Sequence, residues 1–191
     1  MNISIYAGSF NPIHTGHLKL AEYLIDHQFA DEVWFVVSPC NPLKDQAELI
    51  DEFLRLDMVV LATEGNDKFK ASDVEFTMPV PSYTIDTLRQ LAALFPTHHF
   101  SLLIGSDNAL VFNQWKDYTD ILAEFPVMVY PRRGYDFSDV ADKYPTMSLL
   151  NTPYYDISST LIRNNILEME NIQHWLHPKV ASYIQENQLY R

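Results

Sequence analysis

With 191 residues, 47% of them apolar, and a formal net charge of −12, the chain is sized for one compact domain over residues 1–191 with a sizeable core. The negative charge argues against a nonspecific nucleic-acid binder, which needs a basic surface, and leaves room only for a local cationic pocket. The sequence has neither the apolar run of roughly 18 residues that spans a membrane nor a basic N-terminal leader, so we expect a cytoplasmic protein without a membrane partner.

Short apolar runs rich in β-branched and aromatic residues predict strands along the chain. These runs lie at residues 3–7, 32–38, 100–106, 126–132 and 146–151. They lack strict alternation of polar and apolar residues, which is typical of strands that are covered on both faces, as in a parallel sheet.

Helical patterns separate these strands. The apolar stripes are formed by Leu18, Ala21, Leu24 and Ile25, by Leu49, Phe53, Leu56 and Val60, and by Ile85, Leu88, Leu91 and Ala92. Two more helices are expected over residues 158–170 and 177–191, packed on the sheet. The alternation predicts an α/β fold, namely a Rossmann-like doubly wound parallel sheet sandwiched by helices, with C-terminal helices.

Three of the five glycines fall at or just past the ends of predicted strands: Gly8, Gly105 and Gly134. In open α/β sheets this edge holds the ligand crevice, and glycine lets backbone approach a ligand closely or turn with positive φ. Gly134 considered alone is better explained as an ordinary turn glycine.

The stretch "GSFNPIHTGH", Gly8 to His17, joins the first strand to the first helix. Thr15 is the expected N-cap, and His17 falls in the first turn. A helix N-terminus presents unpaired N–H groups to anions, and His14 and His17 add donors that a bound phosphate would hold protonated. A metal site would need a third ligand, and a purely structural turn is the other alternative.

The stretch "DISSTLIR", residues 156–163, predicts a second helix N-terminus of this kind. Ser158 or Ser159 can cap the helix, while Thr160 and Arg163 lie on neighbouring sites of one face. Taken alone, the serines are explained as a cap. Together with the first motif they suggest a polyphosphate that is held between two helix ends.

These two motifs resemble the signatures of the adenylyl-transferring nucleotidyltransferase superfamily, the first of which has the form G-x-F-x-P-x-H-x-G-H. Within it, "PSYTIDTL", "GSDNALVFNQW" and the final "VASYIQENQLY" are similar to bacterial nicotinate-nucleotide adenylyltransferases. The resemblance spans nearly the whole chain. It implies transfer of AMP from ATP to nicotinate mononucleotide, which gives deamido-NAD and pyrophosphate in NAD biosynthesis.

The resemblance also implies roles for individual residues. Catalysis falls to His14, His17, Thr160 and Arg163. ATP is bound by Gly8, Ser9, Phe10, Lys44, Gly105, Asp107, Arg133, Ser158 and Ser159, and nicotinate mononucleotide by Tyr83, Thr84 and Trp115. Mg2+ is expected to arrive on the ATP phosphates rather than on a protein metal site.

For several residues the sequence leaves two possible roles open. Lys44, in a segment that lacks the histidine common in the family, and Arg55 are each either functional or exposed on the surface. One of Arg132 and Arg133 is expected to contact ATP and the other to be structural. Cys40 is expected to be a packed or semi-exposed thiol that cannot form an internal disulfide.

Two other functions stay open beside the main one. One is a related adenylyltransferase for nicotinamide mononucleotide or phosphopantetheine, and the other is a noncatalytic nucleotide-binding regulator. The sequence makes no prediction of oligomeric state.

Overall fold

Six parallel strands form a single sheet in the order β3-β2-β1-β4-β5-β6 in the computed structural model, which describes residues 1–40 and 49–191. The strands are β1 (Asn2–Gly8), β2 (Glu32–Val37), β3 (Phe69–Ser72), β4 (His99–Gly105), β5 (Val127–Tyr130) and β6 (Met147–Leu149). This order reverses between β1 and β4, which pair directly from Asn2 opposite His99 to Ile5 opposite Leu102. The crevice at the carboxyl ends of β1 and β4 is therefore the place where a doubly wound sheet binds its ligand.

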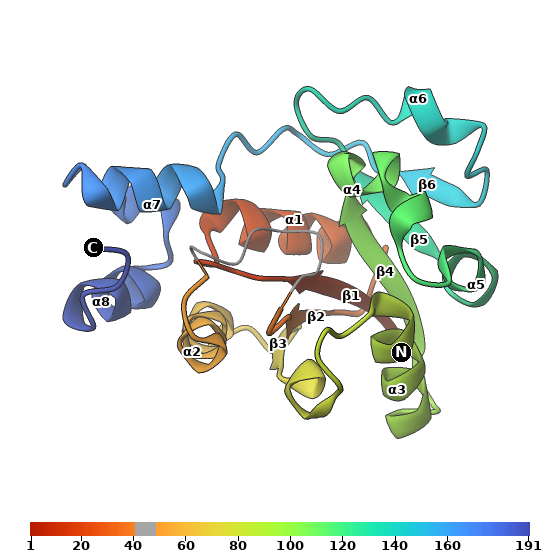
Figure 1. Cartoon of the computed structure of the whole chain (residues 1–191), viewed down its shortest axis with the longest axis horizontal. Helices are drawn as coiled ribbons and strands as arrows, with labels where there is room; N and C mark the ends of the chain where they lie inside the picture. Colours follow the sequence, from red (N-terminus) through yellow and green to blue (C-terminus); the bar gives the residue numbers. More distant parts are fainter. Residues whose placement is uncertain (41–48) are drawn as a thin grey trace.

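Helices connect the strands and flank the sheet (Figure 1). They are α1 (Thr15–Asp26), α2 (Glu52–Thr63), α3 (Thr84–Leu94), α4 (Ser106–Leu110), α5 (Tyr118–Glu124), α6 (Ser138–Ala141), α7 (Ser159–Leu167) and α8 (Pro178–Glu186). Figure 1 shows α7 and α8 together at one end of the molecule with the C-terminus, while α4, α5 and α6 gather at the other end beside β4 and β5. No helix in the described ranges is both long and apolar enough to cross a membrane.

The core lies on both faces of the sheet, because side chains alternate along each strand. Tyr6 and Phe35 join one buried cluster with residues of α1, α2, α7 and α8. Ile5 and Trp34 join a second cluster with residues of α3 and α5. Coverage of both faces explains the continuous apolar runs, and the predicted doubly wound α/β fold is confirmed.

The predicted apolar stripe of α2 was wrong. Phe53 and Val60, assigned to it, are 61% and 49% exposed, whereas Met58 and Val59 are fully buried. The helix begins after Asp51, whose side chain accepts the N–H of Phe53. This start turns Arg55 into the protein, where it is fully buried.

Other boundaries also differ from the sequence prediction. Strand β3 was missed because it is four residues long and includes the exposed Lys70. Strands β5 and β6 and helices α7 and α8 are shorter than predicted. The expected last helix stops at Glu186, and beyond it Leu189 is buried and Tyr190 bonds to Asn11.

Candidate functional site

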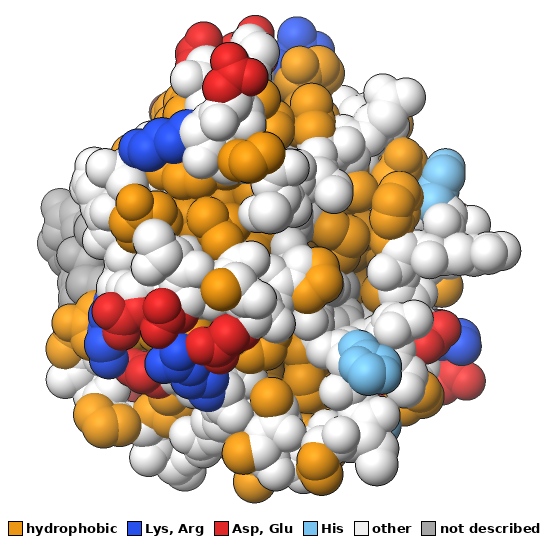
Figure 2. Space-filling model, turned by 90° about the vertical axis from the view of Figure 1, so that its right-hand side faces the viewer, with side chains coloured by type: hydrophobic (Ala, Val, Ile, Leu, Met, Phe, Trp, Pro, Cys, Tyr) orange, Lys and Arg blue, Asp and Glu red, His pale blue; other side chains and the backbone are white. Residues whose placement is uncertain are grey.

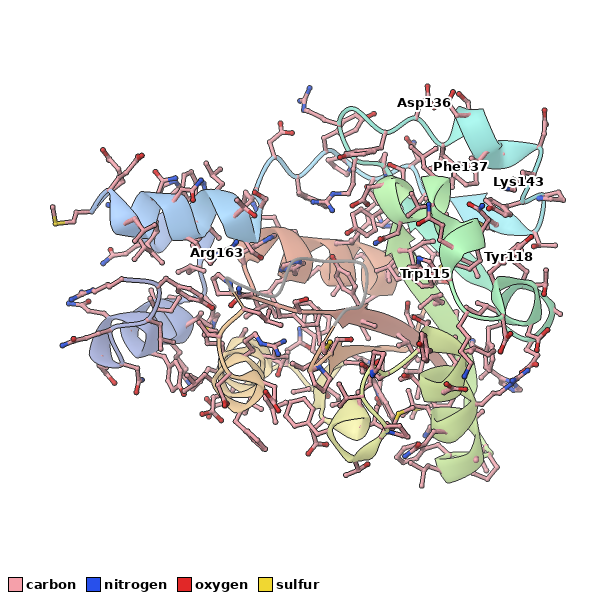
Figure 3. All side chains as sticks on the ribbon, viewed as in Figure 1. Trp115, Tyr118, Asp136, Phe137, Lys143 and Arg163 are labelled. Atoms are coloured by element: carbon pink, nitrogen blue, oxygen red, sulfur yellow. The ribbon has the colours of Figure 1, made fainter. Side chains whose placement is uncertain are left out.

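A cleft of about 960 Å³ opens at the carboxyl ends of β1 and β4. Fifteen of the sixteen site residues predicted from the sequence line it; they are Gly8, Ser9, Phe10, His14, His17, Tyr83, Thr84, Gly105, Asp107, Trp115, Arg133, Ser158, Ser159, Thr160 and Arg163. The sixteenth, Lys44, lies outside the described residues. In Figure 3, Arg163 lies beneath α7 and Trp115 lies beside β4 in the other half of the view, and both line this cleft.

The two motif histidines stack on each other at the start of α1. Their ring centroids are 3.6 Å apart with an interplanar angle of 20°. The N-cap is His14 rather than the predicted Thr15, because His14 is the last residue with extended backbone. Gly16 leaves room for this stack, since a Cβ at that position would lie 3.1 Å from Cε1 and Nδ1 of His14.

The tautomer of His17 follows from one hydrogen bond. The backbone N–H of His14 donates to Nδ1 of His17 at 3.2 Å. Because Nδ1 accepts, the proton of the neutral ring sits on Nε2. His17 thus presents an N–H donor at the N-terminus of α1, where the helix dipole also favours an anion.

His14 is 5% exposed, and burial, aided by the charge of Arg132, lowers its pKa to about 3. Burial therefore opposes the protonation that a bound phosphate was expected to favour. The Nδ1 atom of His14 is buried without a hydrogen-bond partner in the described part of the chain. Unsatisfied buried groups of this kind are uncommon and often mark functional sites.

The buried His14 makes stability depend on pH. In the unfolded chain this histidine binds a proton below about pH 6.5, while in the folded protein it stays neutral down to a pKa of about 3. The unfolded state thus binds more protons in this range, and the free energy of unfolding falls as pH falls. Between pH 7 and pH 5 this loss is about 2 kcal/mol.

Urea denaturation of the wild type and of His14→Asn at both pH values measures the effect. The asparagine cannot titrate, so its variant is expected to lose about 2 kcal/mol less over the interval. Parallel losses in the two proteins would show that His14 protonates as easily when folded as when unfolded.

The loop between β1 and α1 is held by donors from distant helices. Arg55 of α2 is fully buried and donates to the carbonyl oxygens of Ser9 at 2.7 Å, Ser38 at 2.7 Å, Pro39 at 3.0 Å and Ile50 at 2.9 Å. Arg55 is therefore not the exposed surface residue that was one of the two alternatives considered from the sequence. The Ser9 carbonyl and the Phe10 N–H belong to the same trans peptide group and point in opposite directions. Because Arg55 binds the carbonyl, the N–H of Phe10 points away from Arg55.

Helix α7 closes the other side of the same loop. Ser158 caps the helix, since its side chain accepts the N–H of Leu161 at 3.1 Å. Ser159 Oγ donates to the carbonyl of Pro12 at 2.9 Å, and Arg163 donates to the carbonyl of Asn11 at 2.9 Å. Thr160 is exposed in the first turn and lines the cleft. The structure thus brings the two predicted helix N-termini together around one loop.

At the end of β4 an ion pair lines the cleft. Arg132 donates to Oδ2 of Asp107 at 2.8 Å, and the other oxygen, Oδ1, is buried with no partner among residues 1–40 and 49–191. A Cβ on Gly105 would lie 2.3 Å from Oδ1 and 2.8 Å from Cδ of Arg132, so a larger residue there would displace the side chains of this pair.

Arg133 behaves differently from Arg132. It is more exposed, pairs with Asp156 at 2.5 Å, and stacks over Tyr154. Arg132 is thus the arginine with a structural partner inside the site, and Arg133 stays the predicted ATP contact. Gly134 has a φ of 82° in the turn that follows, as expected for a turn glycine.

The predicted pyridine pocket lies at the start of α3 and after α4. Tyr83 precedes α3, Thr84 is its first residue, and both line the cleft with Trp115. The indole N–H of Trp115 is buried and has no acceptor within the described ranges. Lys116 lies over the Tyr83 ring, 4.9 Å from its centroid, and pairs with Asp86 at 2.8 Å.

A residue that sequence reasoning missed is Glu75, in a turn of 3-10 helix, Val74–Thr77. It is 3% exposed, lines the cleft, and accepts hydrogen bonds from Ser38 at 2.7 Å, Ser82 at 2.6 Å and Thr87 at 2.9 Å. One carboxylate thus joins the end of β2, the segment before α3 and α3 itself. The signal available in the sequence was an acidic residue between Val74 and Phe76, just ahead of "PSYTIDTL".

Removal of this carboxylate is expected to loosen the segment that carries Tyr83 and Thr84. For Glu75→Ala we expect an approximately tenfold rise in the KM for nicotinate mononucleotide, because three hydroxyls lose an acceptor. The KM for ATP should stay within about twofold. Steady-state kinetics with each substrate varied in turn measures both values.

Glu64→Ala is the matched control, since Glu64 is exposed and pairs with Lys179 on the surface. Equal rises in both KM values for Glu75→Ala, or an equal effect of Glu64→Ala, would contradict a local role for Glu75.

Cys40 and two histidines outside the predicted site have settings of their own. Cys40 is half-buried and lines the cleft. His98 packs edge-on against Trp34 and face-to-face with Phe95, and His177 is the N-cap residue of α8. Within the described parts of the chain, no group of three or more His, Cys, Asp or Glu residues could hold a metal ion.

Several charged side chains on the outer surface form ion pairs. Arg89 pairs with Asp120 and Glu124, and Lys116 pairs with Asp86. Figure 2 shows acidic and basic side chains next to each other on one face of the molecule. This face does not present the uniformly basic surface that a nucleic-acid backbone requires.

Comparison with known proteins finds a matching family profile and full-length relatives that share one name. The profile of the cytidylyltransferase-like family matches residues 5–165. A protein of Flavobacterium johnsoniae named "Probable nicotinate-nucleotide adenylyltransferase" is 44% identical, and the alignment covers 100% of both chains. A protein of the same name from Bacteroides fragilis is 47% identical over 94% of this chain and 89% of its own.

A solved structure resembles the fold as well. The nicotinic acid mononucleotide adenylyltransferase of Plasmodium falciparum, complexed with NaAD, matches with a TM-score of 0.83 over 99% of this chain and 97% of its own, at 24% identity. At this identity the likeness supports the fold alone. From the family profile and the full-length relatives, the chain belongs to the cytidylyltransferase-like family and, within it, to the nicotinate-nucleotide adenylyltransferases.

Proposed function

We propose that this chain transfers AMP from ATP to nicotinate mononucleotide and releases pyrophosphate and deamido-NAD. The observation that carries the proposal is the meeting of two helix N-termini, those of α1 and α7, around one loop at the switch point of the sheet. The full-length relatives carry the name of this activity. We further propose that residues 1–191 act as one nucleotidyltransferase domain and that the protein is cytoplasmic.

The reaction needs no strong general base. A phosphate monoester has its second pKa near 6, so the attacking oxygen of nicotinate mononucleotide is already largely ionised at neutral pH. This oxygen forms a bond to the α-phosphorus of ATP, and the bond to the bridging oxygen breaks, which leaves the electron pair on pyrophosphate. The protein's task is to position two anions and to stabilise the charge that develops.

The ATP phosphates are proposed to lie between α1 and α7. His17 donates from Nε2, Arg163 supplies a planar cation, and Thr160 supplies a hydroxyl in the first turn of α7. Because these donors are already oriented, they stabilise the negative charge that moves to the leaving pyrophosphate without having to reorganise. His14, held neutral by burial, supports the orientation of His17 by stacking on it.

The nucleoside and pyridine ends are proposed to lie toward β4 and α3. Asp107 faces the ribose of ATP, while Trp115 stacks on the pyridine ring. The N–H groups at Tyr83 and Thr84 would read the nicotinate carboxylate at the N-terminus of α3, an arrangement that suits an anion.

Mg2+ is proposed to arrive with ATP. The residues around the phosphate position are cations, hydroxyls and N–H donors, which is the donor set of an anion site. Mg2+ commonly stays on substrate phosphates with several of its waters, where it would neutralise charge on the leaving group.

The proposal is tested by product analysis. Purified protein with ATP, Mg2+ and nicotinate mononucleotide should form deamido-NAD and pyrophosphate in equal amounts, and a chelator should stop the reaction. Tight ATP binding without turnover would favour a nucleotide-binding regulator. Turnover only with phosphopantetheine would favour the related adenylyltransferase.

A further inference from the structure

The C-terminal residues return to the loop between β1 and α1. After α8 ends, the N–H of Leu189 donates to the carbonyl of Ile184 at 3.0 Å, and Leu189 is 9% exposed. The phenol of Tyr190 then donates to Oδ1 of Asn11 at 3.0 Å, across 179 positions of sequence. The resemblance in "VASYIQENQLY" covers this segment, yet the proposed reaction gives it no role.

The backbone of this segment is costly to form. Gln188 and Tyr190 have φ values of 51° and 65°, in the left-handed region that non-glycine residues rarely adopt. Each such residue raises the free energy of the folded chain, because its Cβ crowds the neighbouring backbone. Such a conformation persists only where the surrounding contacts favour it, and the contacts here are the burial of Leu189 and the bond to Asn11.

Asn11 links the C-terminal segment to the proposed phosphate site. It is 6% exposed and lines the cleft. Its side chain accepts from Tyr190 while its backbone carbonyl accepts from Arg163 at 2.9 Å. Any movement of Asn11 therefore changes the placement of both the loop and the guanidinium.

The phenol stays a donor at neutral pH. Burial raises the pKa of Tyr190 well above its usual value, although the charges of Arg163 and Arg55 lower it in part. The bond to Asn11 therefore does not depend on pH in the range where the protein works.

We propose that Tyr190 is a positioning residue of the ATP half of the site, which acts through Asn11 on the Ser9–Pro12 loop and on Arg163. This inference rests on the proposed function for the identity of the nucleotide. Within the described residues, Tyr190 makes no hydrogen bond to Glu75, Tyr83 or Trp115, which build the pyridine half.

The test compares Tyr190→Phe with Tyr183→Phe. Both variants remove one phenol oxygen from the C-terminal region, but the phenol of Tyr183 donates to Asp57 on α2, away from the cleft, at 2.7 Å. Tyr190→Phe should raise the Kd for Mg-ATP and lower kcat/KM for ATP by about fivefold, the effect of one buried hydrogen bond. The KM for nicotinate mononucleotide should stay within about twofold in both variants.

Thermal unfolding of both variants separates positioning from stability. Similar melting temperatures with an ATP defect confined to Tyr190→Phe would support the proposal. In an Asn11→Ala background, Tyr190→Phe should have no further effect on ATP, since the acceptor is gone.

Wild-type ATP kinetics in Tyr190→Phe, or equal losses for both substrates, would overturn the role of Tyr190. Wild-type protein that binds Mg-ATP but never transfers AMP would overturn the proposed reaction alone. In that case, the Kd for Mg-ATP in the two variants still decides the positioning role.

Discussion

His17→Ala is expected to lower kcat by about 100-fold to 1000-fold, the usual effect of removing one oriented donor from developing negative charge. Binding of nicotinate mononucleotide should change by less than about threefold, because His17 lies at the start of α1 rather than at the pyridine pocket. Single-turnover rates with saturating ATP measure the effect on catalysis, and equilibrium binding measures the affinity for nicotinate mononucleotide.

His27→Ala is the matched control for this experiment. His27 is exposed at the C-terminal end of the same helix and stacks on Tyr23. Its removal should leave kcat within about twofold. If turnover of His17→Ala survived while only mononucleotide binding fell, the role of His17 at the phosphates would be wrong.

Arg163→Ala is expected to lower kcat/KM for ATP by about 100-fold. The change removes a cation from the cleft and the donor to the Asn11 carbonyl. Arg163→Lys keeps the charge but loses the planar fork of donors, so a loss of about tenfold is expected. Initial rates with varied ATP distinguish the three proteins.

Arg89→Ala provides the comparison on the surface. Arg89 is exposed on α3 and pairs with Asp120 and Glu124. Exposed pairs of this kind contribute little, so its kinetics should match the wild type. Full activity in Arg163→Lys would show that charge alone suffices and would contradict the assigned role of the guanidinium geometry.

The fold could be predicted where strands are buried on both faces. The runs that became β1, β2 and β4 are mostly apolar on both faces because helices cover each side of the sheet. Strand β3 could not be found in this way, since an edge strand of four residues needs little apolar surface. In α2 the apolar periodicity predicted the wrong buried face. The true buried face includes Arg55, whose guanidinium donates hydrogen bonds to four carbonyl oxygens.

The site could be predicted where a motif falls at a strand end or a helix start. Gly8, His17 and Ser158 carry local signals of this kind, and the structure brings them to one cleft. For Glu75 and Tyr190 the sequence does not show which residues they contact, because folding brings Ser38 to Glu75 across 37 positions and Asn11 to Tyr190 across 179. The roles of the cleft residues in ATP and mononucleotide binding remain predictions.

Parallel measurement of pyrophosphate release with nicotinate mononucleotide and with nicotinamide mononucleotide tests the central claim most directly. The two substrates differ only in a carboxylate and an amide, which the N–H groups at Tyr83 and Thr84 are proposed to distinguish. We expect kcat/KM to be about 100-fold or more higher for the acid, as a site built for one polar group rejects its analogue. Equal values for the two mononucleotides would contradict the assignment.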